Sequence, residues 1–80
     1  MTIQAILADK GREVATIGAG DSVSEVVAKL GERRIGALPV VGDGQILGII
    51  SERDVIYCLR DHGAEVLDWP VSRVMTSDFP

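Results

Sequence analysis

The segment from Gly48 to Asp54 combines residue types that can hold a sugar and a phosphate. An apolar, strand-like run passes directly into a predicted helix here, and the free amides at a helix start favour an anion. Ser51 adds a hydroxyl at this point, and Arg53 adds a positive charge in the first turn. Asp54 can accept hydrogen bonds from two vicinal hydroxyls, and Gly48 lets another group approach the backbone closely. The segment therefore offers partners for both a phosphate and a ribose.

The same spacing also suits a purely structural role. Ser51 and Asp54 match the S-x-x-[DE] pattern of a capping box, in which each side chain bonds a backbone amide of the other. We expect Ser51 to cap the helix whether or not a ligand binds, and Asp54 can cap in return. The spacing alone leaves both roles open.

A metal centre or a catalytic group is not expected. Cys58 and His62 stand four residues apart, a spacing compatible with a metal, but the chain contains no other cysteine or histidine. Two ligands do not make a zinc site, and nothing evident orients the pair as nucleophile and base. No pair of carboxylates stands out as general acid and base. We therefore expect a protein that is not an enzyme, with Cys58 as a buried thiol.

The elements that must position these residues follow the order strand, helix, strand, strand, helix. The predicted ranges are 14–17, 22–31, 37–41, 45–50 and 51–61. The turn Gly42-Asp43-Gly44 makes the second and third strands an antiparallel hairpin. Both strands are apolar at nearly every position, which predicts burial on two faces. Pro39 cannot donate a ladder hydrogen bond, so it needs an edge or an interruption of the pairing.

Each predicted helix has an apolar stripe at helical spacing. The stripes consist of Val23, Val26, Val27 and Leu30 in the first helix, and of Val55, Ile56 and Leu59 in the second. Ser22 and Glu25 form a second capping pattern, and Glu25 and Lys29 are expected to attract each other weakly on the outer side. Trp69, before Pro70, is expected to be a packing anchor.

Composition limits the remaining choices. A chain of 80 residues buries only about 60% of its unfolded surface, and its single cysteine excludes an internal disulfide. A partner chain is therefore expected to add stability, most simply as a two-fold homodimer. The net charge of -4 argues against nucleic acid and anionic membranes as partners. The apolar runs are too short to span a bilayer, and residues 1–4 lack the character of a signal peptide. A cytoplasmic location is expected.

The stretch from Val14 to Thr76 resembles a repeat of the cystathionine-β-synthase (CBS) family. The resemblance is carried by the joint order and spacing of residues 22–30, 34–41, 48–54 and 71–76. It implies an α+β fold, a single β-α-β-β-α repeat with a three-stranded sheet packed by two helices. Residues 1–80 would then be one repeat, with a core at 14–62, an N-terminal lead-in segment and a C-terminal linker at 63–80. Residues 71–76 resemble residues 3–8, which suggests that this linker leads toward a missing second repeat.

The resemblance also implies a function. CBS repeats pair into a disc-like module whose clefts commonly bind AMP, ADP, ATP or another adenosyl compound, with no cofactor required. The family's G-h-h-[ST]-x-x-D motif (h is apolar) would place Ser51 against phosphate and Asp54 against the ribose hydroxyls, and the adenine slot would be formed by Thr16, Ile17, Ala37, Leu38 and Pro39. Arg53 as a phosphate partner is our own addition.

We therefore expect a regulatory, ligand-sensing module that pairs with itself or with a second CBS repeat and is read by a regulated protein. The alternative is a dimerisation and assembly module without a nucleotide ligand. Binding of a nucleotide would raise the melting temperature, whereas a pure assembly module would show no shift.

Overall fold

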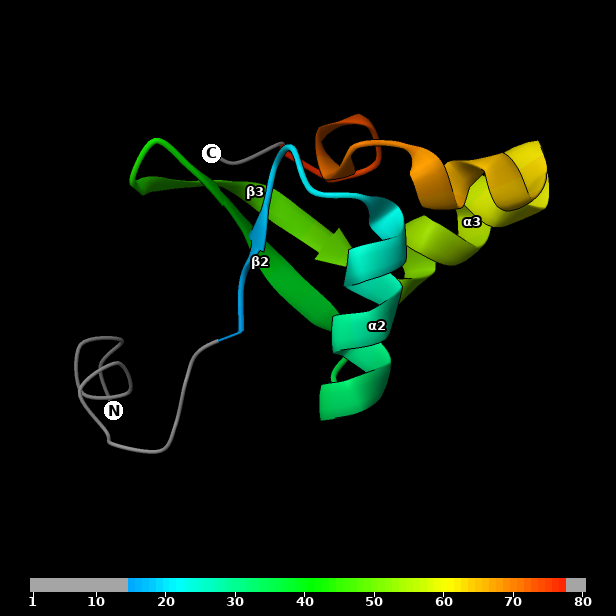
Figure 1. The fold of residues 1–80 in the computed structure, drawn as a ribbon, viewed down its shortest axis with the longest axis horizontal. Coiled ribbons are helices and arrows are strands. Elements are labelled where there is room, and N and C mark those ends of the chain that lie inside the picture. Colours follow the sequence, from blue (N-terminus) through cyan, green and yellow to red (C-terminus); the bar gives the residue numbers. More distant parts are fainter. Residues whose placement is uncertain (1–14, 78–80) are drawn as a thin grey trace.

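The computed structural model describes residues 15–77, which fold around a three-stranded sheet (Figure 1). The elements in chain order are β1 (Ile17–Gly18), α2 (Val23–Arg33), β2 (Ala37–Gly42), β3 (Gln45–Ser51), α3 (Glu52–His62) and the 3-10 helices η1 (Gly63–Asp68) and η2 (Val71–Arg73). The predicted α+β order of strand, helix, strand, strand, helix is confirmed. The predicted lead-in segment lies outside the described residues.

The first strand differs from its predicted range of 14–17. Within the described residues it contains only Ile17 and Gly18. The carbonyl of Thr16 instead accepts a hydrogen bond from Lys29 Nζ at 2.7 Å. The expected attraction between Glu25 and Lys29 is thus replaced by a bond from the helix to the chain that enters the sheet.

The hairpin forms as the sequence predicts. Asp43 and Gly44 both have positive φ angles, 51° and 77°, which suits the tight turn between twisted antiparallel strands. β2 is the central strand, and it pairs in parallel with β1 through Val40 and Val41 alone. Pro39 lies just before the first residue of β2 that pairs with β1. The parallel pairing is therefore absent at Pro39, as the missing donor of a proline requires.

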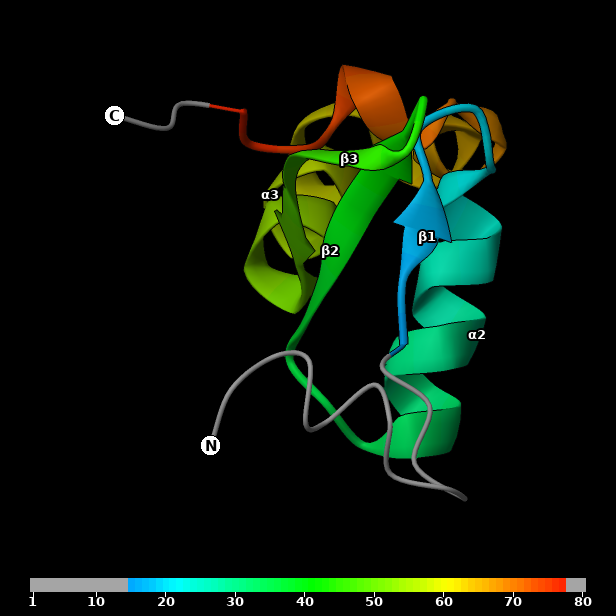
Figure 2. The same ribbon diagram turned by 90° about the vertical axis from the view of Figure 1, so that its left-hand side faces the viewer.

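The helices α2 and α3 lie on the same side of the sheet (Figures 1 and 2), and buried side chains of the helices and strands form the core between the helices and the sheet. The buried core residues are Ile17, Val23, Val26, Leu30, Leu38, Val40, Ile50, Val55, Val66, Val71 and Val74. Burial on both faces of the hairpin was predicted and is wrong for β3, because Ile46 is 57% and Ile49 is 43% exposed. No described residue of this chain covers that face, since the helices pack only on the other.

The C-terminal segment contributes to this core. Val66, Val71 and Val74 are buried, so the core extends beyond the predicted range of 14–62. The segment is also tied to the start of α2, because Val71 N donates to the carbonyl of Asp21 at 2.8 Å and Val23 N donates to that of Trp69 at 3.0 Å. Residues 63–76 therefore pack on the repeat as part of its fold.

The described chain then returns to β3. Ile49 N donates to the carbonyl of Thr76 at 2.9 Å, and Thr76 N donates to that of Ile49 at 2.8 Å. The neighbouring Gly48 makes this approach possible, because a Cβ at Gly48 would lie 2.5 Å from the Thr76 carbonyl oxygen. The close approach that the sequence predicted at Gly48 is therefore made by the chain itself.

Replacing Gly48 by alanine is expected to lower the free energy of unfolding by about 1–3 kcal/mol, because the added methyl group forces the Thr76 backbone away from β3. Urea unfolding followed by circular dichroism measures this change. Gly20→Ala is the matched control, since a Cβ at Gly20 meets nothing within 4 Å. Equal stability of the two variants would contradict the predicted clash.

Candidate functional site

The start of α3 is closed by a complete capping box. Ser51 Oγ accepts a hydrogen bond from Asp54 N at 3.1 Å, and Asp54 Oδ2 accepts one from Ser51 N at 2.9 Å. The structural role predicted from the S-x-x-[DE] spacing is confirmed. The capping box does not use all the hydrogen-bonding groups of these residues. The Ser51 hydroxyl can still donate its proton, and the second carboxylate oxygen of Asp54 can still accept a hydrogen bond.

The second oxygen of Asp54 faces a residue that the sequence did not assign to the site. Asp54 Oδ1 lies 3.5 Å from Thr76 Oγ1, a distance at the weak limit of hydrogen bonding. Asp54 is half-buried and Thr76 is exposed. The carboxylate is thus held in place through Oδ2, while Oδ1 is only loosely engaged and open to a stronger donor such as a sugar hydroxyl.

Anion binding by the helix start is more limited than its sequence suggests. Ser51 N and Asp54 N are used within the capping box. Glu52 N donates to the carbonyl of Gly36 at 2.9 Å. These three amides are therefore committed, and a phosphate here would depend mainly on the Ser51 hydroxyl and on the exposed Arg53 side chain.

The residues predicted for the adenine slot fall into two groups. Ile17 is 1% exposed and Leu38 is 0% exposed, so both belong to the core and offer a ligand no surface in this conformation. Ala37 is exposed and is the ladder partner of Ser51, which places it beside the start of α3. Pro39 and Thr16 are half-buried. A ligand could therefore reach three of the five predicted residues, namely Thr16, Ala37 and Pro39.

The contacts of Cys58, His62 and Trp69 are packing contacts within the fold. Cys58 is half-buried against the core, less buried than expected. The His62 ring lies 4.9 Å from that of Trp69, and the Arg73 guanidinium lies 3.7 Å from the Trp69 ring centroid. Trp69 also packs on the core, so the predicted packing anchor is confirmed.

The resolved pKa shifts lie away from the candidate site. A hydrogen bond from the Arg60 guanidinium to Asp61 lowers the pKa of that carboxyl, and the same bond raises the pKa of Arg60. Both groups are exposed near the end of α3. They do not bear on the chemistry of Asp54, at the other end of the helix.

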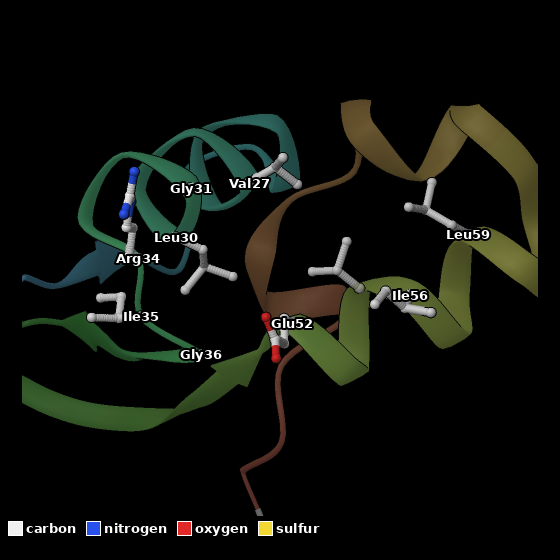
Figure 3. Close-up of a pocket in the computed structure, with 10 residues that line it drawn as sticks. Val27, Leu30, Gly31, Arg34, Ile35, Gly36, Glu52, Ile56 and Leu59 are labelled. Atoms are coloured by element: carbon white, nitrogen blue, oxygen red, sulfur yellow. The ribbon is translucent and has the colours of Figure 1, made fainter.

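A hollow that the sequence did not predict lies between α2 and α3. It is a groove with a volume of about 580 Å³ (Figure 3). Its lining is Val27, Leu30, Gly31, Arg34, Ile35, Gly36, Glu52, Val55, Ile56 and Leu59. Val27 and Ile56 belong to the apolar stripes that the sequence predicted, and they are exposed in the walls of this groove at 43% and 58%.

The family is decided by comparison with known proteins. A family model described as CBS domain matches residues 10–61. The chain belongs to the CBS domain family. It is 29% identical over 67 residues to the CBS domain-containing protein YhcV of Bacillus subtilis (strain 168), a match that covers 84% of this chain and 47% of that protein.

Solved structures give the same result for this CBS chain. A CBS-domain containing protein from Agrobacterium tumefaciens superposes with a TM-score of 0.79 at 37% identity, covering 98% of this chain and 59% of the other. A protein from Methanocaldococcus jannaschii, proposed as an archaeal homologue of g-AMPK, gives a TM-score of 0.74 at 25% identity, covering 84% and 28%. The chain thus spans about half the length of the Bacillus subtilis protein and of the Agrobacterium tumefaciens protein, 47% and 59% respectively.

CBS domains are regulatory modules that generally carry no catalysis of their own, and they commonly pair. The capping box, the accessible Asp54 oxygen and the open face of β3 are the features of this chain that such a role can use. In the described residues 15–77, no helix is long and apolar enough to cross a membrane.

Proposed function

We propose that this CBS domain senses an adenosine-containing nucleotide, with AMP, ADP and ATP as the candidate ligands, and that it catalyses no reaction. The observation that supports this most directly is the state of Asp54. One carboxylate oxygen is fixed by Ser51 N at 2.9 Å, and the other lies at the surface with only a 3.5 Å contact to Thr76. A carboxylate held in this way is ready to accept ribose hydroxyls.

A phosphate would lie near Ser51 and Arg53, and the adenine near Thr16, Ala37 and Pro39. Ser51 supplies a hydroxyl donor, and Arg53 supplies an exposed positive charge. Ile17 and Leu38 support the slot from within the core and make no contact with the base. The proposed site thus keeps six of the eight predicted residues as ligand contacts.

A paired repeat would complete the site. Ile46 and Ile49 leave an apolar face of β3 uncovered by the described residues, and Ile49 is the backbone partner of Thr76, which contacts Asp54. A second CBS repeat, or a second copy of this one, would cover this face and form the other wall of the cleft. A ligand that contacts both repeats favours one arrangement of the pair, and a regulated protein reads that change.

Replacing Asp54 by asparagine is expected to weaken ATP binding roughly 10- to 100-fold, because a hydrogen bond to a charged acceptor is lost while an amide oxygen can still accept from Ser51 N. Isothermal titration calorimetry with AMP, ADP and ATP measures the affinities. Ser22→Ala is the control, since it removes the corresponding bond from Glu25 N at the start of α2 and costs about 1 kcal/mol of stability without touching the site. Undiminished ATP binding by D54N would refute the ribose role.

An assembly module without a nucleotide is the second candidate function, and the apolar groove between α2 and α3 favours it. The two functions differ in thermal unfolding. A specific nucleotide raises the melting temperature progressively with its concentration. A melting temperature unchanged by all three nucleotides would favour assembly alone.

A further inference from the structure

Thr76 is held at the candidate site by its backbone and by its neighbour in the chain. Its amide donates to the carbonyl of Ile49 at 2.8 Å, and its carbonyl accepts from Ile49 N at 2.9 Å. Met75 packs on the core, and its Sδ lies 3.2 Å from the position that a Cβ of Gly48 would take. Residues 74–76, named the strap, therefore lie against β3 through contacts that do not involve the Thr76 hydroxyl (Figure 2).

The strap places the Thr76 hydroxyl beside the free oxygen of Asp54. Thr76 Oγ1 lies 3.5 Å from Asp54 Oδ1. Hydrogen bonds from a hydroxyl to a carboxylate are usually shorter, about 2.5–2.7 Å. The other carboxylate oxygen is already held by Ser51 N at 2.9 Å. The Thr76 hydroxyl thus occupies one side of Oδ1 with a contact that is too long to be strong.

We propose that the Thr76 hydroxyl is an internal competitor of the ribose, and that ribose binding releases the strap from Asp54. The inference rests on the proposed function, because it assigns a regulatory contact to the same carboxylate. Two vicinal ribose hydroxyls that donate to Oδ1 use both of its lone pairs and leave none for Thr76. A ribose bond of ordinary length therefore displaces the contact at 3.5 Å, and the strap loses its side-chain tie to α3.

Displacement of Thr76 connects the ligand to the face that a second repeat would cover. Ile49, the backbone partner of Thr76, is 43% exposed on the open face of β3. By linkage, the factor by which the Thr76 contact weakens nucleotide binding equals the factor by which the nucleotide weakens this contact. Through one hydroxyl group, the ligand thus acts on both the strap and the pairing face.

Thr76→Val tests the competition, because it removes the hydroxyl and keeps the shape of an exposed side chain. T76V is expected to bind ATP about 2- to 5-fold more tightly than the wild type, the low end of the range for one hydrogen bond. Isothermal titration calorimetry measures both affinities. Thr76→Ser, which keeps the hydroxyl, is the matched control and should bind ATP as the wild type does.

Amide hydrogen exchange followed by NMR gives a second measurement, which reports on the strap itself. In the wild type, saturating ATP is expected to speed exchange of the Thr76 and Ile49 amides about 2- to 5-fold, the same factor that T76V gains in affinity. In T76V, the amides of residues 49 and 76 are expected to exchange at the faster rate without ATP, and ATP should add no further increase.

Unchanged or weaker ATP binding by T76V would overturn the competition, and so would slower exchange of the Thr76 amide when ATP is added to the wild type. Either result is obtained with a wild-type chain that binds ATP, so it leaves the ribose role of Asp54 intact. A wild-type chain that binds none of AMP, ADP and ATP refutes the proposed function and this inference together. Failure of the regulatory contact and failure of the nucleotide site are therefore distinguishable.

Discussion

Replacing Leu38 by alanine is expected to lower the free energy of unfolding by about 2–5 kcal/mol, because a fully buried side chain leaves a cavity in the middle of the core. Leu38 lies on the central strand β2, opposite Ile50, which is also 0% exposed. A chain of this length has a total stability of roughly 4–12 kcal/mol, so the loss is a large fraction of the whole. Urea unfolding gives the change directly.

The control for this substitution is Ile46→Ala on β3. Ile46 is 57% exposed, so its truncation removes little buried surface and should cost less than about 1 kcal/mol in the monomer. A Leu38→Ala variant that kept its stability and lost only ATP affinity would instead restore Leu38 to the adenine slot. The experiment therefore separates a core role from a ligand role for a residue that the family motif assigns to the ligand.

Local sequence patterns were sufficient to predict the two helices and the hairpin. Ser22 and Ser51 mark the two helix starts through their hydroxyls, and each accepts the predicted backbone bond. Asp43 and Gly44 fix the hairpin, since both adopt positive φ angles. These features depend on residues within four positions of one another, which is the range over which a sequence pattern is informative.

The covered side of each element could not be predicted in the same way. Helical spacing groups Val26 with Val27 and Val55 with Ile56, but only the packing of neighbouring elements decides which member is buried. Val27 and Ile56 are left exposed because α2 and α3 diverge and leave a groove between them. The apolar residues of β3 likewise predict that both faces are covered, but they do not show whether this chain or a partner chain covers each face.

The candidate site shows the same division. Ser51 and Asp54 were predicted from a four-residue pattern, whereas Thr76 is 22 residues from Asp54 and no local spacing connects them. Its position depends on the pairing of Ile49 with Thr76, which in turn requires the absence of a side chain at Gly48. A contact of this kind follows only from the three-dimensional fold.

Replacing Val71 by aspartate is expected to unfold the chain. Val71 is fully buried, and an unpaired carboxylate in its place costs several kcal/mol in desolvation, which approaches the total stability of a domain of this size. The residue belongs to the segment 63–80 that the sequence predicted as a linker, so the substitution tests whether this segment is part of the folding unit. Far-ultraviolet circular dichroism and the dispersion of amide proton signals report the outcome.

Ser72→Asp is the matched control, because the neighbouring Ser72 is exposed and its amide bond to the carbonyl of Ala19 does not involve the side chain. The S72D chain should stay folded, with a stability within about 0.5 kcal/mol of the wild type. A folded V71D chain would show that residues beyond α3 pack on the core without supporting it. The physical argument against that result is that Val71 N also bonds Asp21 just before α2, so its displacement removes a backbone bond as well as a buried side chain.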